Sequence, residues 1–211
     1  MQEKAADYGV ILCKEQLDLF DTYIKELIEW NSRMNLSGIK DRGRIILELF
    51  LDSLVPAPYL PAKGRLLDVG SGAGFPAIVL KILIPTLNVK LVEANAKKTS
   101  FIKQVIRLLK LSDVGVINGR IENIGDKLSP EGFDIVTSRA WTNLNHFARL
   151  CSSLLLPGGI LVYYSGSSID ENLINSEFFI EERRLSLDRL IPYRLPGMDA
   201  GRNIIMLRRN T

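Results

Sequence analysis

The stretch DVGSGAGFP, residues 68–76, is the part of the sequence best suited to bind a small ligand. It follows the apolar run RLLDV, which predicts a strand, and Pro76 is typical of the first turn of a helix. Gly70, Gly72 and Gly74 therefore predict a turn in which bare backbone lets a ligand approach, while a helix N-terminus supplies N–H donors. A tight turn that binds nothing is the alternative, but the strand–loop–helix context favours a nucleotide-like ligand.

Two acidic residues flank this turn. Asp68 directly precedes it, and Glu93 stands at the end of the next apolar run, VKLVE. The carboxyl ends of neighbouring parallel strands meet at one edge of a sheet, so we expect Glu93 beside the glycines. There its carboxylate can accept hydrogen bonds from two ribose hydroxyls. We count both acids among the residues that bind the ligand.

The glycine spacing helps to separate two classes of nucleotide ligand. Dinucleotide-binding folds carry GxGxxG, whereas this chain has GxGxG followed by Phe75. A nicotinamide-dependent oxidoreductase would also need a second domain for its substrate, and no segment is left for one. DxGxGxG, a strand-end acid and the later LLLPGG are together what class I S-adenosylmethionine methyltransferases show. We therefore expect S-adenosylmethionine as the cofactor.

Short apolar runs alternate with amphipathic helices from residue 65 onward, which predicts βαβ units and a parallel sheet with helices on both faces. We expect strands at 65–70, 89–94, 114–118, 133–138 and 159–164, and helices at 76–84, 97–110 and 143–155. The last two apolar runs, 178–187 and 203–209, have no helix between them. We expect them to close the sheet as an antiparallel pair, joined by a loop that contains Pro192.

The first 62 residues have a different pattern. Apolar residues recur at helical spacing between Leu17 and Ile28, and a second helical stretch is expected at 42–54. Three prolines between 56 and 61 then form a rigid joint. We predict an N-terminal helical extension, residues 1–62, followed by a Rossmann-like domain, residues 63–211.

The amino-acid composition indicates which kinds of partner and site are compatible with this chain. Of 211 residues, 46% are hydrophobic, and the net charge of +3 allows a nucleic-acid partner without requiring one. Cys13 and Cys151 lie far apart and His146 is the single histidine, so we expect neither a disulfide nor a metal site. No signal peptide and no apolar run long enough for a membrane span are evident. We expect a cytoplasmic monomer with reduced thiols.

Nearly the whole chain resembles the RsmG family, also called GidB, of bacterial methyltransferases that act on small-subunit ribosomal RNA. The glycine motif is shared by many methyltransferases, whereas the WN…NL part of EWNSRMNLSGIKD, the LDSL of FLDSLVPAPYL and the SRA of FDIVTSRA are more specific. The resemblance implies a seven-stranded mixed Rossmann-like sheet with a small N-terminal helical extension. It also implies methyl transfer to N7 of one guanine in 16S rRNA, in the 530 loop near the decoding site, on naked rRNA or an assembled subunit.

The resemblance also assigns roles to individual residues. Glu93 would hold the ribose hydroxyls, and Arg139 matches an arginine beside cofactor and substrate, which we expect to be catalytic as well as cofactor-binding. The other expected cofactor residues are Gly70, Gly72, Gly74 and Phe75 on the methionine and ribose side and, in GRIEN, the adenine-binding pair Ile121 and Glu122.

Three positions depart from the family pattern. Glu48 and Leu49 stand where relatives usually read Arg-His, and Asn203 follows Arg202 where histidine is common. These positions lie outside the expected cofactor site, so they leave the RNA target open. A methyltransferase for another RNA, a protein or a small molecule, and a non-catalytic RNA-binding relative, stay as alternatives.

The end of the strand at 133–138 is expected beside the methyl acceptor. Its sequence, Ser138-Arg139-Ala140-Trp141, is neither the Asn-Pro-Pro-aromatic motif of amine methyltransferases nor a cysteine nucleophile. Guanine N7 carries a lone pair and no proton, so its methylation needs alignment but no general base. Basic residues that could meet RNA fall into three groups. One group runs along a single helix and is by default a solvated helix face: Lys97, Lys98, Lys103, Arg107 and Lys110. The N-terminal and C-terminal groups are the better candidates for RNA contact: Arg33, Lys40, Arg42 and Arg44; and Arg183, Arg184, Arg189, Arg194, Arg202, Arg208 and Arg209.

Overall fold

The fold was analysed in a computed structural model of the chain. The structure describes residues 1–128, 131–139, 143–166 and 184–210, with only the backbone at 125–127. No helix within these ranges is long and apolar enough to cross a membrane. The same residues contain no group of three or more His, Cys, Asp or Glu side chains that could hold a metal ion.

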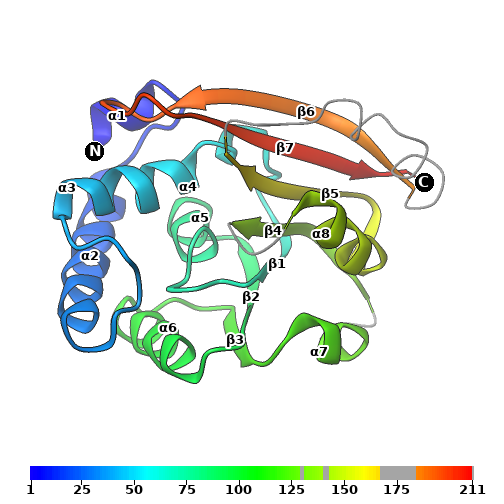
Figure 1. The fold of residues 1–211 in the computed structure, drawn as a ribbon, viewed down its shortest axis with the longest axis horizontal. Helices are drawn as coiled ribbons and strands as arrows, with labels where there is room; N and C mark the ends of the chain where they lie inside the picture. The colour runs from blue at the N-terminus through cyan, green and yellow to red at the C-terminus, as the bar shows by residue number, and fades with distance from the viewer. Residues whose placement is uncertain (129–130, 140–142, 167–183, 211) are drawn as a thin grey trace.

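Seven strands form one mixed sheet through the centre of the molecule (Figure 1). Their order is β3-β2-β1-β4-β5-β7-β6, and β1 to β5 pair in parallel while β7 runs antiparallel to β5 and β6. The order reverses between β1 and β4, where an open sheet leaves a crevice at the carboxyl ends of its strands. The strands are β1 (Gly64–Val69), β2 (Leu87–Glu93), β3 (Val114–Asn118), β4 (Phe133–Arg139), β5 (Leu155–Ser165), β6 (Leu185–Arg194) and β7 (Gly201–Arg209).

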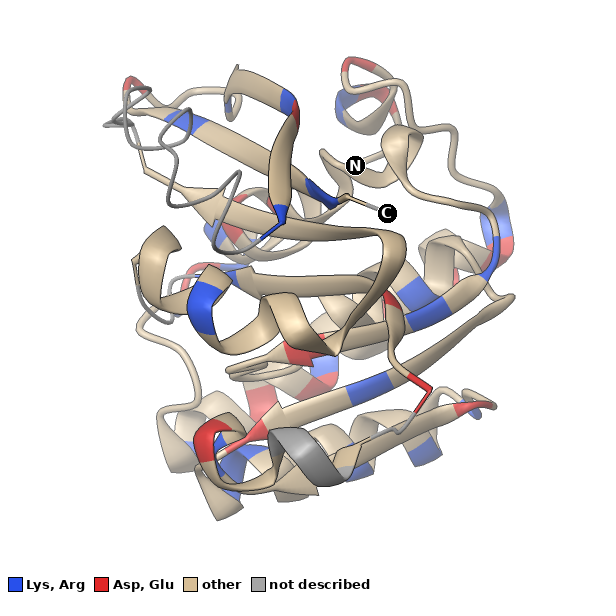
Figure 2. Cartoon of the chain, turned by 90° about the vertical axis from the view of Figure 1, so that its right-hand side faces the viewer, with Lys and Arg blue, Asp and Glu red and all other residues tan. Residues whose placement is uncertain are grey.

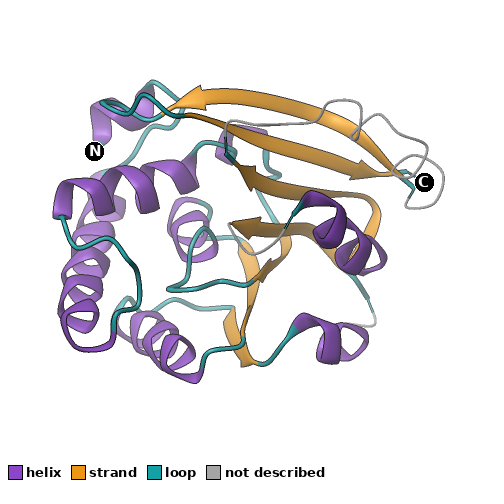
Figure 3. Ribbon diagram, viewed as in Figure 1, coloured by secondary structure: helices purple, strands orange, loops and turns teal. Residues whose placement is uncertain are grey.

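Alternating side chains give the sheet two apolar faces. In β1, Leu66 belongs to one buried cluster and Leu67 to the other, and Ile160 and Leu161 of β5 divide in the same way. Helices cover both faces (Figure 3), as the alternating pattern predicted. The first face packs against α2 (Lys14–Met34), η1 (Ile46–Leu51), α5 (Ala77–Leu83) and α6 (Ala96–Leu108), and the second against α7 (Ile121–Leu128) and α8 (Leu144–Cys151).

The N-terminal helices pack directly on the glycine-rich turn. Tyr23 of α2 is fully buried, stacks on Phe75 with ring centroids 5.1 Å apart, and donates its hydroxyl to the carbonyl of Ala73. A Cβ atom on Gly74, whose φ is +94°, would lie 2.7 Å from the Tyr23 hydroxyl oxygen. Residues on both sides of position 62 therefore belong to one core. The division of the chain into an N-terminal extension and a Rossmann-like domain remains a proposal.

Two helical segments differ from the sequence-based expectation. The stretch expected as one helix at 42–54 is helical throughout, but a π-helical segment, η1, separates α3 (Arg42–Ile45) from α4 (Asp52–Leu54). The helix α7 was not expected, because it is short and Gly125 lowers its helix propensity. Tertiary packing compensates, since Ile121 and Leu128 are buried in the second core.

The final pair of strands is antiparallel as predicted, but its first member is shifted. We expected a strand at 178–187, of which 178–183 lie outside the described residues, and β6 begins at Leu185. Pro192, expected in a loop, lies within β6. The edge position of β6 explains this, because an edge strand tolerates a residue without an N–H donor.

The remaining short elements lie outside the sheet. They are α1 (Gln2–Ala6), η2 (Ala57–Tyr59) and η3 (Ser152–Leu154). Tyr8, just after α1, donates its hydroxyl to the carbonyl of Arg194 and packs edge-on against Tyr193. This contact fixes the N-terminal end of the chain against β6.

Candidate functional site

The glycine-rich turn connects β1 to α5 at the switch in strand order. The N–H groups of Gly70 and Ser71 donate to the carbonyl of Val92 in β2, at 3.0 and 3.2 Å. Gly70, Gly72 and Gly74 all have positive φ, at 72°, 58° and 94°. L-amino acids with a side chain rarely adopt this conformation, so the turn depends on glycine at all three positions.

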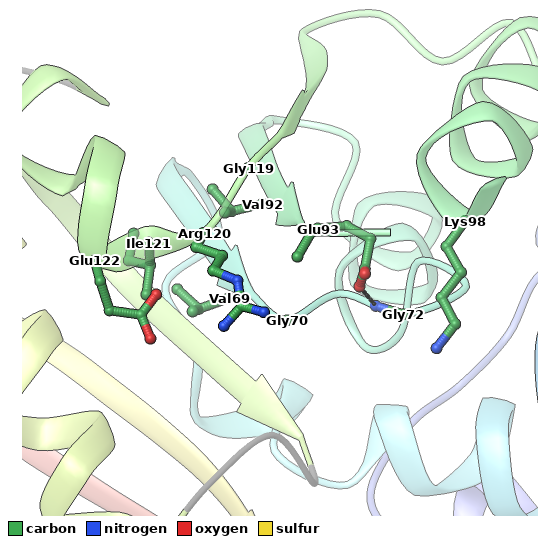
Figure 4. A pocket seen from close by; sticks show the side chains of 11 residues that line it. Val69, Gly70, Gly72, Val92, Glu93, Lys98, Gly119, Arg120, Ile121 and Glu122 are labelled. Carbon is green, nitrogen blue, oxygen red and sulfur yellow. Dashed lines mark hydrogen bonds between the residues drawn. The ribbon is translucent and has the colours of Figure 1, made fainter. Parts of the chain in front are cut away.

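Glu93 is tied to this turn by two backbone hydrogen bonds. Its Oε2 accepts from the N–H of Gly72 at 2.7 Å (Figure 4). Its Oε1 accepts from the N–H of Asn95 at 2.8 Å. The residue is 8% exposed. Each carboxylate oxygen keeps acceptor capacity beyond these bonds, so the side chain can still receive hydrogen bonds from a ligand.

A cavity of about 340 Å³ lies over the carboxyl ends of β1, β2 and β3. It brings together five of the expected cofactor residues: Gly70, Gly72, Glu93, Ile121 and Glu122. In Figure 4, Glu93 and Gly72 lie between the start of α7, which carries Ile121 and Glu122, and Lys98 of α6. A Cβ atom added to Gly72 would meet no other atom within 4 Å. Bare backbone therefore faces open space where the ligand is expected.

Two positively charged residues that line this first cavity were not predicted to belong to the site. Lys98 was assigned only to a basic helix face, and Arg120 was not singled out, although it directly precedes Ile121. Their signal in the sequence is position: Lys98 lies within the first turn of the helix after Glu93, and Arg120 lies just after β3. Both are cations and lie within reach of a negatively charged ligand group.

Gly74 and Phe75 do not line the first cavity. Phe75 is 4% exposed and lies between Tyr23 on one side and Arg139 on the other, whose guanidinium carbon is 5.6 Å from the Phe75 ring centroid. Gly74 gives the space that Tyr23 needs. In this structure both residues contact the buried side of the turn and not the side that lines the cavity.

Asp68 also lies on the buried side of the turn and does not line the first cavity. Its side chain is fully buried, and its Oδ1 accepts a hydrogen bond from the Thr137 hydroxyl at 2.6 Å. Its Oδ2 has no hydrogen-bond partner among the described residues. Burial raises the pKa of Asp68 to about 7, and the hydrogen bond from Thr137 opposes that rise. The folded protein therefore holds a proton on this carboxyl group more tightly than an exposed aspartate does.

Arg139 lines a second cavity, of about 450 Å³, on the other side of the switch point. Its Nη1 donates to Asp52 Oδ2 at 3.1 Å and to the Glu48 carbonyl at 2.8 Å. Asp52 is 1% exposed, and its Oδ1 also accepts from Tyr193 at 2.6 Å and from Arg202 at 3.2 Å. A buried carboxylate and two arginines therefore form one wall of this cavity.

The two cavities border the same edge of the sheet. Ser138, the residue before Arg139, pairs with Val69 of β1 and donates its hydroxyl to the Val69 carbonyl at 3.0 Å. Val69 lines the first cavity and Arg139 the second. The ends of adjacent strands thus separate them.

The positions that depart from the family pattern gather at the second cavity. Glu48 and Leu49 line it. The Asn203 amide donates to the carbonyl of Gly166, another lining residue, at 2.9 Å. None of the three lines the first cavity, as expected from the sequence.

Comparison with known proteins identifies the family. The family model GidB, described as rRNA small subunit methyltransferase G, matches residues 16–205. The chain is 37% identical over 209 residues to ribosomal RNA small subunit methyltransferase G of Acetivibrio thermocellus, with 98% of this chain and 86% of that one covered. It is 34% identical over 211 residues to the protein of the same name from Bacillus cytotoxicus, covering 99% and 88%.

The chain belongs to the GidB family. The resemblance drawn from the sequence motifs is thereby confirmed, and the chain is an rRNA methyltransferase.

Solved structures confirm the fold class of this GidB member. A putative O-methyltransferase from Klebsiella pneumoniae superimposes with a TM-score of 0.62 at 15% identity, covering 90% of each chain. The M. jannaschii TYW2 protein, solved in complex with AdoMet, gives 0.58 at 15% identity over 74% of this chain and 73% of that one. At this identity the likeness establishes the fold, a class I methyltransferase sheet.

Asp68 predicts a pH dependence of the stability of the ligand-free protein. Its folded-state pKa of about 7 lies above the usual aspartate value of 3.8, so the folded state binds this proton more tightly than the unfolded state. The resulting stabilisation is complete below about pH 4 and is lost as the pH rises to about 7. Asp68→Asn has no such proton. Urea unfolding between pH 4 and 8.5 should show wild type losing stability relative to this variant by on the order of a few kcal/mol.

The pH dependence is the readout, because a buried amide also changes the absolute stability. Asp18→Asn, at an exposed aspartate of α2, is the control and should leave the profile unchanged. Parallel profiles for wild type and Asp68→Asn would show that Asp68 is ionised throughout this range.

Proposed function

We propose that this GidB protein transfers a methyl group from S-adenosylmethionine to N7 of a guanine in the 530 loop of 16S rRNA, near the decoding site. The observation that carries the cofactor assignment is the first cavity, where the Glu93 carboxylate is fixed beside the bare backbone of Gly72. The family assignment supplies the rRNA substrate.

The residues of the first cavity fit this cofactor. Glu93 is placed to accept hydrogen bonds from the ribose hydroxyls, and the backbone of Gly70 and Gly72 permits close approach. Ile121 offers an apolar surface for the adenine ring, and Glu122 an acceptor for its exocyclic amine. When bound, S-adenosylmethionine supplies a methyl group on a positively charged sulfur.

The chain has to hold the acceptor and does not have to remove a proton from it. Guanine N7 adds the methyl group through its in-plane lone pair, so the reaction depends on alignment. Two acidic residues, Glu48 and Asp52, line the second cavity. Asp52 already accepts from Arg139, Arg202 and Tyr193, so its lone pairs serve these donors.

Arg139 is proposed as the catalytic residue that orients the acceptor. Its Nη1 is held by Asp52 and Glu48, whereas none of its other N–H groups has a hydrogen-bond partner among the described residues. Those donors are available to a base oxygen or a phosphate of the RNA. Its place at the end of β4, one residue beyond the partner of Val69, sets it beside the first cavity.

RNA binding is proposed to use basic residues around this edge. Lysine and arginine residues occur on several helices and strands (Figure 2). Of the expected groups, Arg183 lies outside the described residues, and Arg202 faces the second cavity. We propose that a monomer binds the rRNA, alone or in the small-subunit particle, through these dispersed contacts.

Substitution of Gly72 tests whether the turn binds the cofactor. Gly72→Val would place a branched side chain in the open space of the first cavity, and we expect no detectable S-adenosylmethionine binding by calorimetry. Gly158→Val is the matched control, because Gly158 also has a positive φ, +78°, and open space around its Cβ position. The control should suffer the same backbone strain and keep its affinity. Normal binding by Gly72→Val would mean that these glycines only form a turn.

Substitution of Glu93 tests the ribose contact. Glu93→Ala should weaken S-adenosylmethionine binding by ~1.5–3 kcal/mol, the range for a hydrogen bond to a charged group. Because Glu93 also accepts from Gly72 and Asn95, Glu93→Gln is needed as a second variant that keeps the side-chain shape. Thermal midpoints separate loss of affinity from loosening of the turn. An unchanged dissociation constant in both folded variants would remove Glu93 from the site.

The proposed target atom can be read directly from the product. RNA methylated at guanine N7 is cut by borohydride and aniline, so the labelled 16S rRNA should break at a single guanine in the 530 loop. Without a titrating base, the single-turnover rate should vary little between about pH 6.5 and 9. Label that resists this cleavage, or that maps to another base, would contradict the N7 assignment.

A further inference from the structure

The second cavity contains a carboxylate that the proposed reaction does not otherwise use. We propose that Glu48 is the residue that selects guanine, by accepting hydrogen bonds from N1–H and the N2 amino group of the base. This inference rests on the proposed function, because it takes the second cavity as the acceptor site.

The hydrogen bonds of the two carboxylates distinguish them. Asp52 is surrounded by donors on both oxygens and is 1% exposed. Glu48 uses only Oε1 for a hydrogen bond, from Arg44 Nε at 2.6 Å, and Arg44 is itself on the surface. Glu48 Oε2 forms a long ion pair with Arg202 Nη2 at 3.7 Å, which is beyond hydrogen-bond distance. Among the described residues, Glu48 is thus the cavity-lining carboxylate with an oxygen open to a ligand.

Local backbone structure fixes where Glu48 lies. It belongs to the π-helical segment η1, and its carbonyl accepts from Arg139 at 2.8 Å. The neighbouring residue Leu49 is buried and adds an apolar surface to the same cavity. A π-helical turn within a helix often marks a functional site. Here it coincides with the point where the N-terminal helices meet the end of β4.

The cavity has the size and lining of a site for a base. Its volume of about 450 Å³ falls in the range of small-molecule sites. Tyr164 and Tyr193 supply aromatic surface, and Arg139 and Arg202 supply donors. A flipped base held in a protein is read on its Watson–Crick edge by hydrogen bonds and held between apolar or aromatic groups. The second cavity offers both kinds of contact.

Guanine is the base that this carboxylate fits. Its Watson–Crick edge presents two adjacent donors, N1–H and the N2 amine. These match Oε2 of Glu48 and the acceptor capacity that Oε1 keeps beside its hydrogen bond from Arg44. Adenine presents a bare N1 acceptor in the central position, which a carboxylate repels. Glu48 therefore favours guanine and disfavours adenine by the same contact.

The charge of Glu48 also suits the reaction. Methyl transfer forms the N7–C bond and breaks the S–C bond, so the positive charge leaves the sulfur and arrives on the guanine ring. Arg139 and Arg202 alone would oppose a cation in the second cavity, whereas Glu48 and Asp52 balance them. A carboxylate bound to the base therefore stabilises the positively charged, methylated guanine more than it stabilises the neutral guanine before methyl transfer.

Inosine in place of the target guanine provides the test, because it keeps N7 and N1–H but lacks the N2 amine. Wild-type enzyme should methylate guanosine-containing small-subunit RNA with a kcat/KM about 5- to 150-fold above that of the inosine-substituted RNA, the equivalent of 1–3 kcal/mol for a paired contact. Glu48→Ala should reduce this ratio to within threefold, mainly by slowing the guanosine substrate. The isosteric Glu48→Gln should reduce it as well. Both should bind S-adenosylmethionine as wild type does, within twofold.

Glu29→Gln is the matched control, because Glu29 forms the same kind of i,i+4 pair with Arg33 on an exposed face of α2. It should keep the wild-type ratio. A guanosine-to-inosine ratio that is unchanged in folded Glu48→Ala or Glu48→Gln, with thermal midpoints near wild type, would overturn the proposal. Mapping the wild-type product first keeps the two claims apart: methylation away from guanine N7 rejects the proposed function, whereas N7 methylation with a ratio independent of Glu48 rejects only this inference.

Discussion

The buried carboxylate of Asp52 is the constraint on which the arrangement of the site depends. An unpaired charge at 1% exposure would cost several kcal/mol, so its partners must be in place whenever the protein is folded. Those partners come from the ends of three strands: Arg139 of β4, Tyr193 of β6 and Arg202 of β7. The network therefore fixes the N-terminal helices against the far half of the sheet and forms the wall of the second cavity at the same time.

A second set of contacts fixes the near half of the site. Glu93 holds Gly72 from the ligand side, and Tyr23 supports Ala73 and Phe75 from the core. The Arg139 guanidinium also lies over the Phe75 ring, so a residue of the glycine-rich turn contacts a residue that lines the second cavity. The N-terminal helices thus contribute to both cavities, through Tyr23 at one and Asp52 at the other. This explains in physical terms why a small helical extension accompanies the methyltransferase sheet.

Local signals in the sequence predicted much of this arrangement. The glycine spacing, the strand-end position of Glu93 and the alternation of apolar runs were sufficient to predict that Glu93 lies beside the glycines at the carboxyl ends of the strands, where the first cavity lies. The pairing of Asp52 with Arg139 was not predictable, because the two residues are 87 positions apart and neither lies in a motif that names the other. The sequence likewise marks Glu48 only as a departure from the family pattern, because its contact with Arg139 joins residues that are far apart in the chain. Gly74, Phe75 and Asp68 belong to the same motif as Gly72, but periodicity does not show which residues of a turn face the ligand and which face the core.

The central claim is that donor and acceptor bind in two neighbouring cavities on either side of the β1–β4 switch. A crystal structure with S-adenosylhomocysteine and a short RNA containing the target guanine tests it most directly. The account predicts ribose hydroxyls within hydrogen-bond distance of Glu93, adenine against Ile121, and the target guanine in the second cavity beside Glu48 and Arg139. A guanine held outside that cavity, or a nucleoside bound without contact to Glu93, would contradict it.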